Sequence, residues 1–184
     1  MNKDLLPRST AMLQSSNIYI VGINGLQEDP TDHSGRSKIY LHPGQLFASV
    51  KPSAVTTILG SCVALCLWDA KLKIGGVNHF LLPSASDGGT PSTRFGNVAL
   101  RALLNQLIKL GSQKRNLQAK LFGGACVLDA FQERENHLGA RNIQLAQTFL
   151  GQQFIPLAGQ DLAGRKGRKL IFHTDNGAAW VKYL

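Results

Sequence analysis

The chain has 184 residues and a formal net charge of +9. Hydrophobic residues make up 43% of it and charged residues 17%, a balance that argues against global disorder and allows one buried core. No apolar run approaches the ~20 residues that span a bilayer, and the N-terminus lacks a signal-peptide pattern. We therefore expect a cytoplasmic protein with reduced thiols and no membrane insertion.

The first part of the chain carries weak structural signals. Residues 17–23, NIYIVGI, are compatible with one short strand, and residues 23–37 are polar and rich in Gly, Pro, Asp and Ser, as loops are. Residues 1–37 are therefore expected to be a partly flexible extension, and residues 38–184 one domain. Residues 1–44 hold four basic and four acidic residues, so the rest carries the whole surplus, 16 basic against 7 acidic.

Short apolar runs dominate the next part of the chain. KIYLHPGQLFASV predicts a strand, a Pro-Gly turn and a second strand. TTILG, VALCLWD and IGGVNHFLL follow closely, and runs this short and apolar indicate strands buried on both faces. Gly60 and Ser61 predict a turn between the first two of these runs.

The hydrophobic period then changes to that of a helix. Residues 95–111 carry an apolar stripe and end at a glycine, which predicts an amphipathic helix through Val98, Ala102, Leu103, Leu107 and Leu110. A strand over 119–128 and a second helix over about 136–151 follow. FIPLA, RKLIFHT and AAWVKYL are three more strand candidates, the last two joined at Asn176-Gly177. Strands outnumber helices without strict alternation, so the class is α+β.

Cys62 is the first candidate for chemistry. It follows the Gly60-Ser61 turn, where unpaired backbone N–H groups can lower a thiol pKa or hold an oxyanion. Cys66 lies between leucines and reads as an inert core thiol, whereas Cys126 follows a Gly-Gly-Ala stretch. No cysteine spacing has the CxxC form, so neither a metal nor a cofactor is expected. Burial as a small hydrophobe is the commoner state of any one cysteine.

His79 is the second candidate, because an imidazole among strand residues is costly without a partner. A core histidine bonded to a backbone carbonyl is one explanation. The other is that a strand, a turn and a return strand place His79 beside Cys62, as a thiol nucleophile and its acid–base partner. Thr56 and Thr57 precede Cys62 and offer a hydroxyl that can orient the imidazole.

A dense basic cluster lies near the C-terminus, and it marks a candidate docking patch for an acidic partner; solvated strand-edge charges are the plainer explanation. The cluster consists of Arg165, Lys166, Arg168 and Lys169. A basic nucleic-acid-binding module is a rival interpretation of the chain. It would need aromatic residues interleaved on a basic face, and aromatic residues make up only 7% of the sequence, so no nucleic-acid partner is expected.

LGSC at 59–62 and KIGGVNHFLLP at 73–83 resemble the signature of the CheD family, the chemoreceptor glutamine deamidases of bacterial chemotaxis. FGNVALRALLNQLIKLG, KLFGGA, LGARN and DLAGRKGRKLIFHTDNGAAWVK resemble further segments of the family, in order, over about residues 38–184. The resemblance implies a fold of sandwich-like β-sheets flanked by helices, similar to the catalytic fold of cytotoxic necrotizing factors.

The resemblance also implies roles for individual residues. The family's nucleophilic cysteine falls on Cys62, its histidine on His79 and its threonine on Thr56, with Thr57 one position away. The turn residues Gly60 and Ser61 are expected to support the site or hold the oxyanion. Asn78, which precedes the histidine, is expected to share this supporting role.

The implied activity is that of a protein-glutamine glutaminase, which converts glutamines of methyl-accepting chemotaxis receptors to glutamate, releases ammonia and thereby tunes adaptation. Some members also bind a CheC-type phosphatase. Three alternatives stay open: methylesterase activity at the same site, a basic nucleic-acid-binding module, and an adaptor without turnover.

Overall fold

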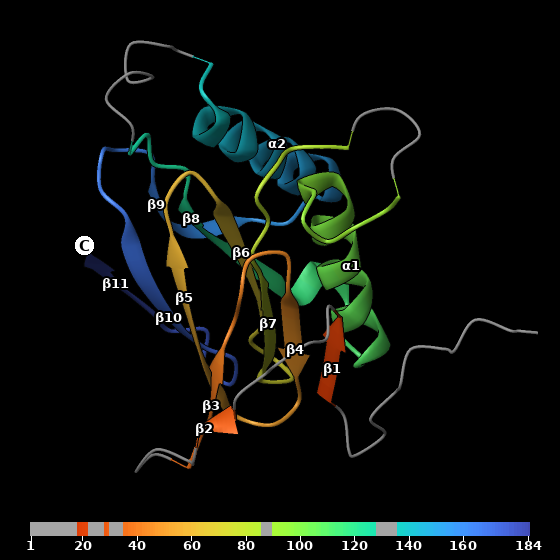
Figure 1. Cartoon of the computed structure of the whole chain (residues 1–184). Coiled ribbons are helices and arrows are strands. Elements are labelled where there is room, and N and C mark those ends of the chain that lie inside the picture. The colour runs from red at the N-terminus through yellow and green to blue at the C-terminus, as the bar shows by residue number, and fades with distance from the viewer. Residues whose placement is uncertain (1–17, 22–27, 30–34, 86–89, 128–135) are drawn as a thin grey trace, which may run out of the picture.

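Two β-sheets and two helices form three layers in the described part of the chain (Figure 1). The computed structural model describes residues 18–21, 28–29, 35–85, 90–127 and 136–184. The strands are β1 (Ile18–Val21), β2 (Glu28–Asp29), β3 (Ser37–Tyr40), β4 (Leu46–Ser49), β5 (Ser53–Leu59), β6 (Val63–Asp69), β7 (Ile74–Asn78), β8 (Leu117–Gly123), β9 (Leu157–Leu162), β10 (Arg168–His173) and β11 (Ala179–Tyr183). The helices are α1 (Gly96–Lys109), a short 3-10 turn η1 (Lys114–Asn116) and α2 (Leu138–Gln153).

Both sheets are mixed. The first has the order β1-β4-β7-β6-β8-β9 and the second the order β11-β10-β5-β3-β2. All pairs are antiparallel except β8 with β9 and β3 with β5. The chain crosses from the second sheet to the first after β3 and again after β5, and it returns to the second sheet between β4 and β5. Because β3 and β5 run in the same direction, both crossings lie at the same end of the sandwich.

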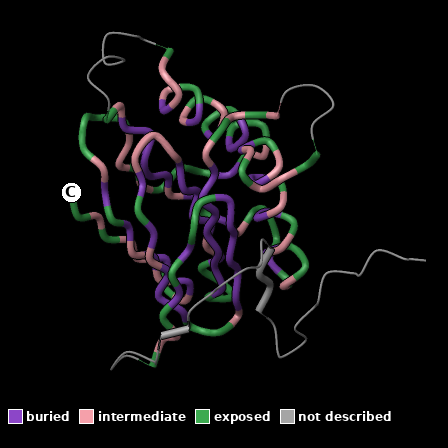
Figure 2. Tube along the Cα trace, in the orientation of Figure 1, coloured by how far each residue is buried: buried purple, intermediate pink, exposed green. Residues whose placement is uncertain are grey.

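The core between the two sheets is built from strand residues that alternate inward. β5 contributes Val55 and Leu59, β10 contributes Leu170 and Phe172, and the facing sheet contributes residues such as Cys66. These positions repeat every second residue, as expected where one face of a strand is buried. The buried tube at the centre of Figure 2 follows these strands.

The second core lies between the first sheet and the helices, which cover its other face (Figure 1). β6 contributes to both cores, because Val63, Leu65 and Leu67 face the helices whereas Ala64 and Cys66 face the other sheet. This confirms that its apolar run is a strand buried on both faces. The predicted stripe of the first helix was wrong in part, since its buried leucines are Leu100, Leu103, Leu104 and Leu107.

Other sequence-based expectations meet the structure with small shifts. The α+β class is confirmed, and β10 and β11 form the predicted antiparallel hairpin. The strand predicted over FIPLA begins later, because β9 starts at Leu157, after Phe154 closes α2 in the left-handed conformation. β1 pairs with β4, so residues 18–21 belong to a sheet. Of the helices that the structure describes, none has the length and apolarity to cross a membrane.

Candidate active site

Cys62 and His79 lie on neighbouring chain segments at the end of the sandwich where both crossings occur. Val63 bridges Phe80 in the register that pairs β6 with β7, so Cys62 lies opposite Leu81 and diagonal to His79 on the same face. Diagonal residues of an antiparallel pair are within reach of long side chains. The backbone of His79 is hydrogen-bonded to the segment between β3 and β4. Its N–H donates to Gln45 O (2.9 Å), and its O accepts from Gly44 N (2.7 Å). The turn and return strand expected from the sequence therefore bring both residues to one face.

The imidazole of His79 is oriented by Thr57, across the core between the sheets. Nδ1 lies 2.8 Å from Thr57 Oγ1, and Oγ1 also lies 2.7 Å from the carbonyl oxygen of Leu41. A hydroxyl has one hydrogen to donate, and the carbonyl can only accept. Thr57 therefore donates to Leu41 and accepts from Nδ1–H, which leaves the lone pair of neutral His79 on Nε2.

The expected orienting role of Thr56 is corrected by this contact. Thr57 is 1% exposed and points inward with Val55 and Leu59, whereas Thr56 is partly exposed. Side chains alternate between the two faces of a strand, so an offset of one residue changes the face. The structure thus brings Thr57, and not Thr56, to the imidazole.

Burial is the dominant influence on His79. The residue is 1% exposed, and this desolvation lowers its pKa to about 4, with the charge of His42 acting in the same direction. The Leu41 carbonyl acts in the opposite direction and raises the pKa. His79 is therefore neutral at physiological pH. Its Nε2 is buried and has no hydrogen-bond partner among the residues that the structure describes.

Cys62 is half-buried at the turn, and desolvation raises the pKa of its thiol above the ordinary value. Hydrogen bonds from the backbone of Cys62 and Gly60 act in the opposite direction. With a raised thiol pKa and a lowered imidazole pKa, the resting pair is a neutral thiol and a neutral imidazole. Catalytic hydrogen bonds are often long before substrate binds, so the unpartnered Nε2 is compatible with a general base.

The other two cysteines occupy different environments, and all three are reduced thiols. Cys66 is fully buried between the sheets, and this desolvation strongly raises its pKa. Its expected role as an inert core thiol therefore fits its packing. Cys126 is half-buried beyond the end of β8, where its N–H donates to Gly164 O (2.9 Å).

The turn that carries Cys62 is held from two other elements. Gly124 N donates to Cys62 O (2.7 Å), and Ala125 N donates to Gly60 O (2.8 Å). From α2, the side-chain amide of Asn142 donates to Ser61 O (3.1 Å). Sequence reasoning did not single out Asn142. The signal was its place in the LGARN segment, but nothing in a helical period tells which distant carbonyl an amide will reach.

Of the residues expected to support the site, the structure places the turn residues there but not Asn78. The backbone N–H groups of Ser61 and Cys62 donate no backbone hydrogen bond within the described residues, so they can still serve an oxyanion. Asn78 is not brought to the site. Its Oδ1 accepts from Leu65 N (3.0 Å), on the face that carries Leu65 and opposite to that of His79. The expectation for Asn78 is therefore wrong, because alternation along the strand turns it toward the helices.

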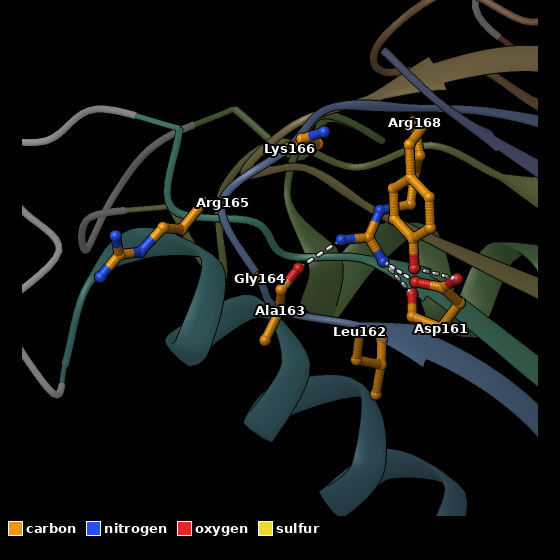
Figure 3. Close-up of a pocket in the computed structure, with 8 residues that line it drawn as sticks. Asp161, Leu162, Ala163, Gly164, Arg165, Lys166 and Arg168 are labelled. Atoms are coloured by element: carbon orange, nitrogen blue, oxygen red, sulfur yellow. Dashed lines mark hydrogen bonds and ion pairs between the residues drawn. The ribbon is translucent and has the colours of Figure 1, made fainter.

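Three residues of the basic cluster, Arg165, Lys166 and Arg168, line a hollow of about 290 Å³ at the loop between β9 and β10. Figure 3 shows their side chains. Arg168 does not belong to a docking patch, because it is 1% exposed and ion-paired with Asp161. Its guanidinium also donates to the carbonyl of Ala163, and Tyr183 donates a hydrogen bond to the same carboxylate (2.8 Å). The rest of the cluster is exposed: Arg165, Lys166 and Lys169. The expectation for Arg168 is corrected by β10, which turns every second residue inward.

The described residues offer no cluster of side chains that could bind a metal ion. Among the described residues, no three His, Cys, Asp or Glu side chains are placed together so that they could hold a metal ion. The site offers a thiol, an imidazole nitrogen with a free lone pair and backbone N–H groups at one turn. Such a set can attack an acyl carbon and pass a proton to a leaving group.

Comparison with known proteins identifies relatives over most of the chain. Residues 81–183 match the sequence model of a family described as "CheD chemotactic sensory transduction". A "Probable chemoreceptor glutamine deamidase CheD 1" of Anaeromyxobacter dehalogenans is 47% identical, over 82% of this chain and 86% of the relative. A "Probable chemoreceptor glutamine deamidase CheD" of Sulfurimonas denitrificans is 41% identical, over 80% and 94%. A protein of the same description from Stenotrophomonas maltophilia (strain K279a) is 42% identical, over 78% and 72%.

Proposed function

Because the chain belongs to the CheD family, we propose that it is a protein-glutamine glutaminase that deamidates glutamines of chemoreceptors and so tunes chemotactic adaptation. The observation that carries the proposal is the bonding of His79. Thr57 accepts the hydrogen bond of Nδ1–H, so Nε2 keeps a free lone pair on the face that also carries Cys62. Residues 38–184 form the deamidase domain of this proposal.

The first half of the reaction is acylation. As the substrate carboxamide binds, Nε2 of His79 takes the proton of the Cys62 thiol, and the thiolate attacks the carboxamide carbon. A tetrahedral intermediate forms, and its oxyanion accepts hydrogen bonds from the backbone N–H groups of Ser61 and Cys62. The imidazolium then gives its proton to the amine nitrogen. Ammonia leaves, and a thioester between the glutamyl side chain and Cys62 remains.

The second half of the reaction is hydrolysis of the thioester. Nε2 of His79, neutral again after the loss of ammonia, takes a proton from water, and the hydroxide attacks the thioester carbon. The tetrahedral intermediate collapses with the Cys62 sulfur as leaving group, and the proton returns to the thiolate. The products are a glutamate side chain and the starting enzyme. Throughout both halves Thr57 holds Nδ1–H, as the third group of a catalytic triad does.

The partner is a receptor that presents glutamines on an acidic surface in the cytoplasm. The surplus of basic residues after position 44 supports this, because a basic body is drawn to an acidic one. Of the basic cluster, the exposed Arg165, Lys166 and Lys169 are the docking candidates that remain. A CheC-type phosphatase as a second partner, and a likeness to the catalytic fold of cytotoxic necrotizing factors, stay part of the proposal.

Intact-mass spectrometry tests the proposal with a cytoplasmic receptor fragment from the same organism. Wild-type protein is expected to add ~1 Da per converted glutamine and to release equimolar ammonia, whereas Cys62→Ala and Cys62→Ser are expected to do neither. Cys126→Ala is the matched control and retains turnover. Ammonia release by Cys62→Ala at the wild-type rate would overturn the assignment of the nucleophile.

The same assay separates the methylesterase alternative. A methylated fragment of the same receptor is offered, and methanol is measured beside ammonia. Deamidation predicts ammonia from unmodified glutamines with at most minor methanol. Methanol without ammonia would replace the proposed reaction by ester hydrolysis at the same cysteine.

A further inference from the structure

The side chain of Asn142 joins the two segments that carry Cys62 and His79. Its Nδ2 donates to Ser61 O (3.1 Å), in the turn just before Cys62, and to Leu81 O (2.8 Å), two residues after His79. The residue is fully buried. An amide nitrogen carries two hydrogens, and both are used here, one on each segment.

The two carbonyls are well placed to control the site. Cys62 and Leu81 are opposite one another in the register of the strand pair, and no regular ladder extends beyond the bridge of Val63 with Phe80. Beyond this bridge, regular backbone hydrogen bonds no longer join the segment of Cys62 to the segment of Leu81. Asn142 supplies the cross-link that the ladder no longer provides.

The side-chain amide of Asn142 reaches both carbonyls because α2 packs closely against the Cys62 turn. Gly139, in the first turn of α2, lies against Gly124, and a Cβ at Gly139 would be 2.3 Å from Gly124 O. Gly124 has a φ of +71°, and a Cβ there would be 2.4 Å from the side chain of Ile143. Two glycines thus allow the helix to touch the segment that also bonds Cys62 O. The GGA and LGARN segments meet at the Cys62 turn.

We propose that Asn142 is a positioning residue that sets the separation of the Cys62 thiol from Nε2 of His79. It contacts neither the substrate nor the reacting atoms and acts through the backbone on both sides. Within the resting pair the thiol and Nε2 are not hydrogen-bonded, so their approach depends on how these two segments are held. The catalytic part of this inference rests on the proposed deamidase activity.

Two substitutions remove the cross-link, and the second of them also keeps the volume of the asparagine side chain. Asn142→Leu leaves both carbonyls without their donor, and Asn142→Thr retains one hydroxyl donor for one of them. A displacement of about 1 Å between reacting groups can cost about 100-fold in rate. We expect kcat to fall about 10- to 100-fold for the leucine variant and less for the threonine variant, with KM changed by less than about 2-fold.

The three cysteines supply a readout that does not depend on turnover. Iodoacetamide labelling is followed by mass spectrometry at Cys62, Cys66 and Cys126 as a function of pH. Loss of the cross-link loosens the turn, so the labelling midpoint of Cys62 is expected to shift toward that of an ordinary thiol. Cys66, fully buried, stays protected unless the protein unfolds. Gln144→Leu, an exposed amide on the same helix, is the matched control and is expected to change neither readout.

Each result is decisive. A fall in kcat with a shifted Cys62 midpoint and a protected Cys66 supports the positioning role. Wild-type kcat and an unchanged Cys62 midpoint in the leucine variant would overturn it, even if stability falls. If Cys66 labels in the leucine variant, that variant has unfolded and the threonine variant decides by the same two criteria. If wild-type protein releases no ammonia, the proposed function fails while the labelling midpoints still decide the inference.

Discussion

His79 Nδ1 and Thr57 Oγ1 lie 2.8 Å apart, although the two residues belong to strands of different sheets. The carbonyl of Leu41 fixes the direction of this hydrogen bond, because it accepts the one hydrogen bond that the Thr57 hydroxyl can donate. The tautomer of the histidine is thus set by a backbone group of the first sheet crossing.

Replacing Thr57 tests this relay. We expect Thr57→Val to lower kcat about 10- to 100-fold with little change in KM, because Nδ1–H loses its acceptor and the tautomers become mixed. Thr57→Ser, which keeps the hydroxyl, is expected to retain most activity. Thr56→Val, on the other face of β5, is the matched control and should remain near wild type. Equal losses at both positions would contradict the relay.

The resting state of Cys62 is accessible to labelling. Because burial raises its thiol pKa, the rate of iodoacetamide labelling should rise with pH to a midpoint above that of an unfolded cysteine peptide. Peptide mapping against urea-unfolded protein gives both midpoints. A midpoint well below neutral pH in the substrate-free enzyme would instead indicate a preformed thiolate–imidazolium pair.

The stability of the protein should depend on pH through His79. Its pKa of about 4 lies below the unfolded value of about 6.5, so its contribution is present above pH 6.5 and is lost as pH falls toward 4. The shift corresponds to roughly 2–3 kcal/mol of unfolding free energy between pH 7 and pH 4.5. Urea unfolding followed by tryptophan fluorescence measures this loss.

His79→Gln isolates the effect of that one residue. Asp175, whose pKa is lowered by its hydrogen bond with Arg36, also loses stabilisation in acid, and it does so in both proteins. The wild type should therefore lose more free energy than the variant over the same pH range. Parallel losses in the two proteins would show that His79 is not buried in its neutral form. His42→Gln, at an exposed histidine, serves as the control.

Arg168 is expected to matter for stability and not for docking. Arg168→Met should lower the unfolding free energy by about 3 kcal/mol, because Asp161 and the carbonyl of Ala163 lose a charged donor. The value lies at the lower end for buried pairs, since Asp161 keeps contact with water. Lys169→Met, one residue away and exposed, should change it by less than about 0.5 kcal/mol. Similar effects of the two substitutions would refute the structural role.

The sequence was most informative where periodicity alone decides. The doubly buried run of β6 and the amphipathic pattern of α1 could be read from it. For Cys62 and His79 the pattern allowed a shared face but equally a core histidine, and the family resemblance favoured the pair. The choice between Thr56 and Thr57 could not, because two adjacent threonines fit either face of a strand equally well. Which of the two threonines faces the core is clear only once Val55 and Leu59 are known to point inward.

Polar contacts between residues far apart in the chain also could not be predicted from the sequence. Arg168 sits in a run of charges that suggests solvent, yet its alternation with Leu170 and Phe172 marks it as inward, a signal that the cluster obscured. Asn142 gave no comparable signal. Its role follows from the glycine contact that seats α2 against the Cys62 turn, and contacts between distant segments have no local sequence pattern.

The hydroxyl-to-carbonyl relay behind His79 is electrically neutral, and this affects which leaving group the site can expel. A carboxylate in that position would raise the pKa of the imidazolium and make it a weaker acid. Thr57 and Leu41 carry no charge, so burial remains the largest influence, keeps the pKa of His79 at about 4 and leaves its imidazolium with a strong tendency to give its proton away. An amine departs from a tetrahedral carbon only after protonation, and an alcohol depends on it less. The neutral relay therefore favours the proton transfer on which the departure of ammonia depends.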